Sequence, residues 1–412
     1  MPHRLSILMI MSHPRFKIHS RGYAMAKHLV DRGHDVTLIV TAERRRLGIV
    51  ETEWDGVWTV ETPDLLWGRL RSGWDPWNML NKVLYLRAHK RHYDLIYCAS
   101  TRPAVIYPAL YYKNRHHLPM ITDWIDWWGR GGIIDEFRPR WYRPLFGRIE
   151  TYYEEAFRTR AEGVMVISKA LAKRAVGLGV EQARILHLPN GSWTELFNVP
   201  DSAACRRKVG LDTNGAIIGY SSLDTHFDLA LMIEVLAQVV RQYPQVQLLI
   251  TGNSPKEISK LAEANGVREH LILTGFLPDE ALPWYLGCAD LFVMPFPDKI
   301  YNVGRWPSKV NCYMSVGRPT VSNPVGDMKP LFEKHNIGLL AEWDPKDFAQ
   351  KIIFLLEHPD IARELGQNAR RAAVTEYDWK VLIGKLERFY CEVLNMSEGD
   401  HNILHDSSAA SA

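Results

Sequence analysis

The sequence contains few cysteines and no spacing that pairs them. Among its 412 residues there are five, which lie far apart, at Cys98, Cys205, Cys288, Cys312 and Cys391. An odd and scattered set argues against a disulfide framework and against a zinc site. Such cysteine usage fits a reducing compartment, so we expect a cytoplasmic protein. No metal ion and no permanently bound cofactor are expected.

The sequence also lacks a strong charge of one sign and a long apolar run. Its net charge of +3 is small for this length, which argues against a nucleic-acid-binding protein. No segment approaches the ~20 apolar residues that a membrane span needs. The run Leu5–Met11 is too short for the core of a signal peptide. We therefore expect a chain that neither spans a membrane nor is exported.

A glycine-rich turn is missing after the first apolar run. Ser12-His13-Pro14-Arg15-Phe16 stands where a nucleotide-binding dehydrogenase would place its phosphate-binding glycines. The glycines of Gly129–Gly132 follow a loop and not a strand, so they are no dinucleotide fingerprint either. These absences argue against a dehydrogenase.

The residues that are present predict a soluble α/β protein. Hydrophobic residues make up 46% of the chain and charged residues 24%, which is enough apolar surface to bury. Short apolar runs alternate with helical patterns, as in a parallel sheet covered on both faces. The length suits two such domains. We expect two doubly wound, Rossmann-like domains facing a central cleft, with ligands outside the carboxyl ends of the strands.

The alternation divides into two series separated by a polar stretch. Residues 1–197 are expected to form the first domain and 198–376 the second, with a flexible linker near Asn190–Leu211. A helix over 377–396 should pack back on the first domain, and 397–412 should form a disordered tail. The predicted strands are Leu5–Met11, Asp35–Val40, Asp94–Cys98, Met120–Asp123, Gly163–Ile167, Ile185–Leu188, Ile217–Tyr220, Gln247–Thr251, Leu271–Leu273 and Leu291–Met294.

The segment Tyr301–Ser322 indicates function most directly. It predicts a loop containing Gly304, then a helix that starts at Pro307 and ends at Gly317, then a short strand. The free amides and the dipole of such a helix start attract negative charge. Arg305 and Lys309 add positive charge. A diphosphate-binding site for a nucleotide-linked donor is one interpretation, and a loop with two solvated cations is the other.

The loop Thr122–Gly132 is the second candidate. It combines carboxylates, tryptophans and glycines directly after a predicted strand. In the functional interpretation Asp126, with Asp123, binds hydroxyls of a donor or acceptor while the tryptophans stack on sugar rings. In the alternative, Trp124 and Trp127 pack in the core or the loop and the aspartates cap a helix.

Several segments, in order along the chain, resemble a known family. They are Gly22–Val36, Val166–Leu171, Pro189–Gly191, Leu248–Pro255, Thr274–Pro278, Ala289–Pro295 and Pro307–Val321. The chain is similar to retaining glycosyltransferases of the GT-B fold, most of all to glycosyltransferase family 4 (group 1). The resemblance runs from the first strand to about Tyr390.

The resemblance implies an enzyme whose donor substrate is a nucleoside-diphosphate sugar. It implies no metal, and the leaving phosphate oxygen acts as the base. The donor contacts that it implies are Gly304, Arg305, Ser308, Lys309, Cys312, Ser221, His226, Gly252, Phe276 and Leu277. Near the acceptor it implies Arg15, Arg21, Gly22, Trp124 and Arg130, although the loop carrying Arg15 and Arg21 could equally be solvated.

Three positions depart from the family pattern. Gly304 and Cys312 stand where the family carries two glutamates, and Ile125 stands where it carries a histidine. A thiol is a weak acceptor and cannot bind hydroxyls as a carboxylate does. A non-catalytic or diverged nucleotide-sugar-binding protein and a nucleotide-sugar epimerase therefore stay as alternatives. The base, the sugar and the acceptor (a glycan, a lipid, a lipid-linked glycan or a small metabolite) are left open.

The stretch Leu66–Leu80 mixes tryptophan with arginine. That composition suits a membrane interface, and packing against the next helix is the alternative. Peripheral association with the cytoplasmic face of a membrane is therefore a further expectation.

Overall fold

The apolar runs of the sequence form the strands of two separate sheets in the computed structural model. The structure describes residues 4–13, 20–43, 47–64, 73–211, 215–222, 226–254 and 256–409, without the side chains of 226–228, 256 and 396–409. Contacts divide the chain into unit 1 (residues 1–189, 304–306 and 379–412) and unit 2 (190–303 and 307–378). Both sheets are mostly or wholly parallel, which confirms the expected α/β class.

The unit boundaries differ from the predicted 197/198 and 376/377. Residues that follow Pro189 already pack within unit 2, because Ser192 forms a bridge with Asp378. The Ser192 amide also donates to the carbonyl of Tyr377 at 2.6 Å. These bonds tie the predicted linker to the end of unit 2.

Unit 1 is built on an eight-stranded sheet in the order β3-β4-β2-β1-β5-β6-β7-β8. All neighbours are parallel except β3 and β4, an antiparallel hairpin whose turn residues Asp55 and Gly56 both have positive φ. This hairpin departs from the parallel alternation that the sequence predicted. The strands are β1 Ser6–Ile10, β2 Asp35–Thr41, β3 Val50–Trp54, β4 Val57–Thr62, β5 Leu95–Cys98, β6 Met120–Trp124, β7 Gly163–Val166 and β8 Ile185–His187.

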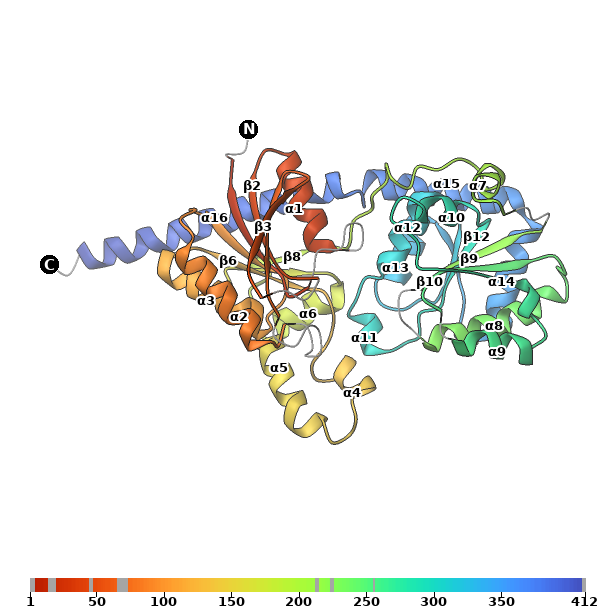
Figure 1. Ribbon diagram of the computed structural model, residues 1–412, viewed down its shortest axis with the longest axis horizontal. Helices are drawn as coiled ribbons and strands as arrows, with labels where there is room; N and C mark the ends of the chain where they lie inside the picture. Colours follow the sequence, from red (N-terminus) through yellow and green to blue (C-terminus); the bar gives the residue numbers. More distant parts are fainter. Residues whose placement is uncertain are drawn as a thin grey trace. The chain divides into compact units, whose positions relative to one another are not determined.

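Helices cover both faces of this sheet, with α2 and α3 packed together on one face and α1 against α16 on the other (Figure 1). Buried apolar side chains of β1, β5, α2 and α3 form one core. The helices are α1 Arg21–Asp31, α2 Pro76–Ala88, α3 Pro103–His116, α4 Ile133–Phe137, a π-helical turn Arg143–Gly147, α5 Arg148–Glu155, α6 Lys169–Gly177, a 3₁₀ turn Gln182–Arg184 and α16 Trp379–Ala409.

Helix α16 is bound to unit 1 by an ion pair and a hydrogen bond. Glu387 accepts from His34 at 2.8 Å and lies 2.6 Å from the guanidinium of Arg32. The helix continues to Ala409, whereas the sequence predicted a disordered tail from residue 397. No proline interrupts residues 379–409, and an isolated glycine such as Gly399 costs only about 1 kcal/mol in a helix.

Unit 2 is built on a six-stranded parallel sheet in the order β11-β10-β9-β12-β13-β14. Its strands are β9 Ile217–Ser222, β10 Gln247–Gly252, β11 Leu271–Gly275, β12 Leu291–Met294, β13 Thr320–Ser322 and β14 Gly338–Leu340. Its helices are α7 Ser202–Val209, α8 His226–Val240, α9 Lys256–Ala264, a 3₁₀ turn Arg268–His270, α10 Leu282–Gly287, α11 Ile300–Val303, α12 Ser308–Val316, α13 Met328–His335, α14 Pro345–Glu357 and α15 Pro359–Thr375.

Part of the predicted flexible linker is a helix. The side chain of Asp201 caps α7, and Gly210 ends it in the left-handed region. Cys205 on α7 is buried against Gly287 of α10, where an added Cβ would lie 2.5 Å from the sulfur. The polar composition of Asn190–Leu211 therefore did not indicate that part of it forms an ordered, packed helix.

The helix predicted between Pro307 and Gly317 is confirmed as α12. Pro307 is its N-cap residue, and Gly317, with φ of 76°, is its C-cap. Across the described part of the chain, we find no helix with both the length and the apolar character required to cross a membrane.

Candidate functional site

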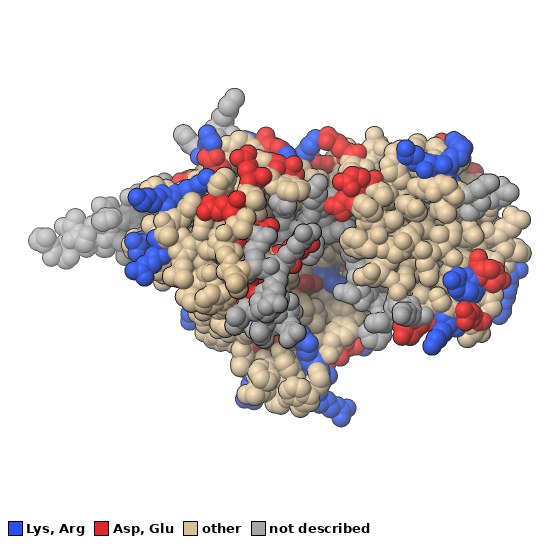
Figure 2. Space-filling model, in the orientation of Figure 1, with Lys and Arg blue, Asp and Glu red and all other residues tan. Residues whose placement is uncertain are grey.

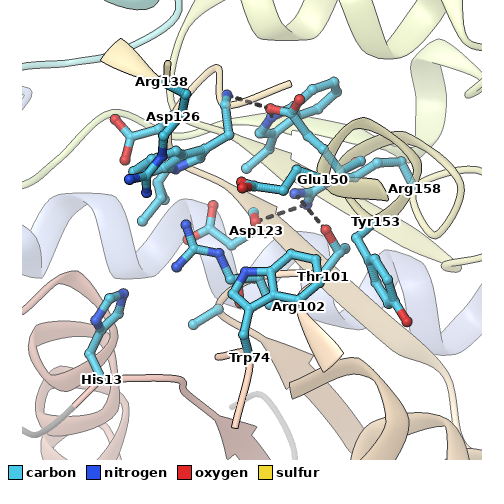
Figure 3. Close-up of a pocket in the computed structure, with 16 residues that line it drawn as sticks. His13, Trp74, Thr101, Arg102, Asp123, Asp126, Arg138, Glu150, Tyr153 and Arg158 are labelled. Carbon is cyan, nitrogen blue, oxygen red and sulfur yellow. Dashed lines mark hydrogen bonds between the residues drawn. The ribbon is translucent and has the colours of Figure 1, made fainter. Parts of the chain in front are cut away.

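A cavity of about 370 Å³ opens in unit 1 where β5 and β6 end (Figure 3). The carboxyl edge of a parallel sheet is where ligands of doubly wound proteins bind. Three parts of the chain supply most of its wall: the segments after β5 and β6, and helix α5. The lining residues are His13, Trp74, Ala99, Ser100, Thr101, Arg102, Asp123, Trp124, Ile125, Asp126, Trp128, Arg138, Glu150, Tyr153, Glu154 and Arg158.

Asp123 stands near the end of β6, and one of its two carboxylate oxygens is satisfied. Oδ2 accepts from Arg21 Nε at 2.7 Å and from the Tyr97 hydroxyl at 2.6 Å. Oδ1 is buried and has no hydrogen-bond partner among the described residues. Burial and the Asp123 charge raise the pKa of Tyr97 well above its usual value, so Tyr97 stays a donor. Asp123 thus brings a fixed charge and one buried, unpartnered oxygen to the cavity wall.

Arg21 and Gly22, both expected near an acceptor, have structural roles in unit 1. Besides Asp123, the Arg21 guanidinium donates to the carbonyls of Leu188 at 2.8 Å and Pro189 at 2.9 Å. Arg21 is not among the lining residues. A Cβ added at Gly22 would lie 2.5 Å from the sulfur of Met11, so a larger residue there would force the Met11 side chain to move. Arg15 lies outside the described residues.

Glu154 of α5 holds the loop that follows β6. Its Oε1 accepts from Trp124 Nε1 at 2.9 Å and from the Trp128 amide at 2.8 Å. Its Oε2 accepts from the amide of Gly129 at 2.5 Å. A Cβ at Gly129 would lie 2.3 Å from Oε2, so only glycine permits this approach. The sequence analysis missed Glu154, because nothing in the helical pattern of α5 shows that its carboxylate faces inward.

Trp124 packs inside unit 1 and exposes only 1% of its surface. The guanidinium groups of Arg158 and Arg174 lie over its ring, 4.8 Å and 5.0 Å from the centroid. Arg174 also lies 4.4 Å from the ring centroid of Trp127. These contacts bury Trp124 and favour packing over stacking on an acceptor. Trp127 also packs on Arg174 but stays partly exposed.

Asp126 lines the cavity and keeps part of its surface exposed. Burial raises the pKa of its carboxyl to about 6, although the charges of Arg305 and Arg102 act in the opposite direction. Arg305 belongs to the short segment 304–306 that groups with unit 1. A carboxyl with such a pKa changes protonation near neutral pH, as acid–base and hydroxyl-binding groups often do.

Arg130 lies apart from this cavity. Its side chain is 78% exposed and 3.5 Å from Glu155, and it lines a second hollow of about 580 Å³ beside α4 and α5. Of the stretch Leu66–Leu80, residues 66–72 lie outside the described residues. Trp74 lines the unit 1 cavity and contacts Tyr153 of α5 edge-on at 5.2 Å, whereas Trp77 and Leu80 are 41% and 42% exposed. Both interpretations of this stretch therefore stay predictions.

In unit 2, α12 packs over the end of β9. Lys309 Nζ lies 3.3 Å from the Tyr220 hydroxyl and 4.4 Å from the centroid of its ring. The Tyr313 hydroxyl accepts from the amide of Ser221 at 2.8 Å. No side chain caps the start of α12, where Pro307 precedes Ser308. Backbone amides and one ammonium group therefore gather at the carboxyl edge of this sheet.

Two buried hydroxyls end the neighbouring strands β9 and β10. Ser222 is 1% exposed and Thr251 is fully buried, and neither side-chain oxygen has a hydrogen-bond partner among the described residues. Gly252 is paired with Ser222 at φ of 90°, and an added Cβ would lie 2.0 Å from the Ser222 carbonyl oxygen. Buried hydroxyls without partners are rare, so each needs a partner that the described residues do not supply, such as a bound water or a ligand. Thr251 escaped the sequence analysis, where it appeared only as the end of a strand.

Family comparisons match most of the chain. The model for the glycosyl transferase 4-like domain matches residues 19–191, and the model for glycosyl transferases group 1 matches residues 201–372. The chain belongs to the group 1 glycosyltransferases. This confirms the resemblance inferred from the sequence.

Curated relatives are distant and are matched only in part. Over 244 residues the chain is 22% identical to an alpha-D-kanosaminyltransferase of Streptomyces kanamyceticus, covering 58% of this chain and 62% of that protein. Over 214 residues it is 27% identical to the phosphatidyl-myo-inositol mannosyltransferase of Mycobacterium tuberculosis, covering 50% and 53%. The matches thus span little more than half the length of these relatives.

Solved structures with the same fold cover nearly the whole chain. Sucrose-phosphate synthase of Thermosynechococcus elongatus superposes with a TM-score of 0.73 at 18% identity, over 95% of this chain and 100% of that chain. Anabaena HepE in complex with UDP-glucose superposes with a TM-score of 0.71 at 17% identity, over 94% and 100%. At these identities the likeness shows the fold alone, and it confirms the GT-B architecture.

The donor contacts implied by the group 1 family fall into separate places. Ser308, Lys309 and Cys312 lie on α12, and Ser221 lies on β9, whereas Gly304 and Arg305 group with unit 1. Burial raises the pKa of the Cys312 thiol to about 12, so it stays neutral. Phe276 is 70% exposed and Leu277 partly buried after β11. His226 begins α8, and its side chain lies outside the described part.

The described part of the chain contains no group of three or more His, Cys, Asp or Glu side chains that could hold a metal ion.

Proposed function

We propose that this protein is a retaining glycosyltransferase that moves a sugar from a nucleoside-diphosphate sugar to an acceptor hydroxyl. The observation that carries the proposal is the carboxyl edge of the unit 2 sheet. There an uncapped helix start and Lys309 lie over the end of β9, and the neighbouring strands end in the buried hydroxyls of Ser222 and Thr251. Oriented amides and a cation are what a diphosphate requires. Membership in the group 1 family supports the same assignment.

The proposed chemistry rests on stabilising the leaving diphosphate. As the bond from the sugar to the phosphate oxygen breaks, negative charge grows on the diphosphate, and Lys309 with the α12 amides offsets it. The acceptor hydroxyl attacks from the face that the diphosphate leaves, and the leaving phosphate oxygen takes its proton. Asp126 and the unpartnered oxygen of Asp123 bind substrate hydroxyls in unit 1. No divalent ion takes part in this scheme, so activity should persist in EDTA.

A nucleotide panel tests the donor assignment. UDP, GDP, ADP and dTDP are candidates, because relatives include a GDP-mannose-dependent mannosyltransferase and the neighbour HepE binds UDP-glucose. A matching nucleotide at 100 times its dissociation constant should stabilise the protein by roughly 2.7 kcal/mol, which is readily measured by thermal shift. If none of the diphosphates or their sugars raised the melting temperature, the donor site in unit 2 would be refuted.

Retention is tested separately, on the product. The anomeric proton of the transferred sugar, followed by NMR during a single turnover, should keep the configuration that it has in the donor. An inverted product would leave the donor site standing and overturn the retaining mechanism.

A binding protein without transferase activity is the second candidate. It is favoured by Cys312, a neutral thiol in a position where the family carries a carboxylate, and by Ile125 on the cavity wall. Donor hydrolysis or transfer above background would exclude this candidate. A nucleotide sugar returned with its sugar epimerised would instead identify an epimerase. The acceptor and a cytoplasmic location stay predictions.

A further inference from the structure

The segment Phe137–Ile149 of unit 1, named here the docking segment, runs from the end of α4 into the start of α5, within the connection from β6 to β7. It contains four arginines, Arg138, Arg140, Arg143 and Arg148, and no aspartate or glutamate. In Figure 1 α4 and α5 form the lower end of unit 1, and in Figure 2 blue side chains border a tan surface there. Positive charge and apolar surface thus share one part of the molecule.

In α5, which continues this segment, two acidic side chains are buried and apolar side chains are exposed. Its carboxylates Glu150 and Glu154 are 5% and 6% exposed, whereas Leu145, Ile149 and Tyr152 are 62%, 40% and 51% exposed. The apolar residues follow one another at spacings of four and three, so successive turns place them on one side. A water-soluble helix normally shows the opposite distribution. The outward apolar stripe therefore needs a partner to cover it.

Large aromatic side chains extend the stripe. Trp141 is 70% exposed, Phe137 43% and Phe146 41%. The rings of Tyr142 and Phe146 stack 5.0 Å apart, and Pro139 and Pro144 restrict the backbone between them. The surface is thus preformed. Aromatic and aliphatic groups bordered by arginines match the depth profile of a membrane interface, with apolar groups in the acyl boundary and cations at the phosphates.

We propose that the docking segment binds the surface of an anionic lipid bilayer. Charge favours an anionic partner, because the four arginines outnumber the exposed carboxylates of Asp135 and Glu136 that directly precede the segment. The same helix supplies Glu150, Tyr153 and Glu154 to the wall of the unit 1 cavity. A docked bilayer therefore lies about one helix diameter, roughly 10 Å, from that cavity. Binding to lipid needs no donor and stands independently of the proposed transfer reaction.

Vesicle co-sedimentation of the full chain, without nucleotide, tests the proposal. Binding to phosphatidylcholine vesicles containing phosphatidylglycerol should exceed binding to pure phosphatidylcholine by more than tenfold, since each basic side chain near the surface contributes about fivefold. Raising the ionic strength from about 0.1 M to about 1 M should remove most of the difference.

Variants assign the binding to this segment. Trp141→Ala and Arg140→Glu should each weaken binding at least fivefold, while the exposed controls Trp343→Ala and Arg363→Glu should not change it. These positions are on the surface, so the melting temperatures should stay within a few degrees. The proposal is overturned if neutral vesicles bind equally well or if the segment variants bind like their controls. It is also overturned if the chain dimerises and Trp141→Ala separates the dimer, because the stripe then covers a second copy.

Discussion

The carboxyl edges of the two sheets are built in opposite ways. In unit 1, Asp123, Glu154 and Arg158 are held by buried hydrogen bonds and ion pairs that fix the cavity wall. In unit 2, Ser222 and Thr251 bury hydroxyls for which the described residues provide no partner. The charged side chains of the first edge are fixed mainly by the protein itself, although Asp123 Oδ1 there also lacks a described partner. For the second edge we propose that a ligand completes the site. Substitutions should therefore act mainly on stability in unit 1 and mainly on ligand affinity in unit 2.

The largest effect is expected from Asp123→Ala. Removing the carboxylate leaves the buried Arg21 guanidinium without its counter-charge, which typically costs about 3–5 kcal/mol. The free energy of unfolding in urea measures this loss. The control Asp31→Ala breaks an exposed ion pair with Lys27 and should cost less than about 1 kcal/mol. Equal losses in both variants would contradict the organised edge in unit 1. If Asp123→Ala does not fold, Tyr97→Phe removes a single donor and should cost about 1 kcal/mol.

Lys309→Ala tests the edge in unit 2. Loss of one charge-assisted contact of about 1.5–3 kcal/mol should weaken nucleoside-diphosphate binding roughly 10- to 150-fold. Calorimetric titration gives the affinity, and the melting temperature without ligand should change little. Lys329→Ala, an exposed lysine on α13, is the matched control. Unchanged affinity in Lys309→Ala together with Arg305→Ala would refute the phosphate-binding roles of both residues.

Asp126→Asn should stabilise the protein and reduce its activity. A pKa raised by burial to about 6 means that the protonated carboxyl favours the folded state. The stabilisation that the protonated carboxyl gives to the folded state is complete below about pH 4 and is lost as the pH rises through 6. An asparagine never becomes charged in this buried place. Asp126→Asn should therefore raise the free energy of unfolding by about 1–3 kcal/mol at pH 7.5 and leave it unchanged at pH 4. Unfolding curves at the two pH values, with the exposed Asp298→Asn as control, measure the difference.

The activity of the unsubstituted protein should fall below pH 6, because an ionised Asp126 is the better hydroxyl acceptor. A flat profile of the transfer rate between pH 5 and pH 8 would contradict this role while leaving the stability prediction untouched.

The smallest effects are expected when two buried threonines, one in each unit, are replaced by valine. Thr62 in unit 1 donates to the Val40 carbonyl at 2.8 Å, so Thr62→Val should cost about 1–3 kcal/mol. Thr251→Val in unit 2 removes a hydroxyl without a described partner and should change the stability of the free protein by less than about 0.5 kcal/mol. It should instead reduce the stabilisation by nucleotide. Equal losses in the free energy of unfolding of the two variants, measured without ligand, would contradict the proposed difference between the two units.

The regular elements were largely predictable. β12 was predicted with the bounds that it has, and α12 was located by Pro307 and Gly317, because apolar runs and helix-terminating residues act within a few positions of themselves. The hairpin of β3 and β4 was missed because all five residues of β3 are exposed and give no apolar run. The helix α7 was missed because its only buried residue is Cys205.

The candidate site was predictable in its location but not in the roles of its residues. The sequence placed Asp123 at the end of a buried strand and Asp126 just after it, and both line the cavity. It could not show that Trp124 is covered by two arginines, nor that Arg21 is bound to carbonyls 167 and 168 residues away in sequence. Such pairings depend on which strands become neighbours.

By itself, the sequence determined the α/β class, the family and the positions where strands and helices end. Each of these follows from local order: periodicity, turn residues and short motifs. Only the tertiary structure decided which carboxylates are satisfied, which hydroxyls lack partners and which face of α5 points outward. Those properties depend on distances between residues far apart in the chain, because desolvation and hydrogen bonding act only between groups that folding brings together.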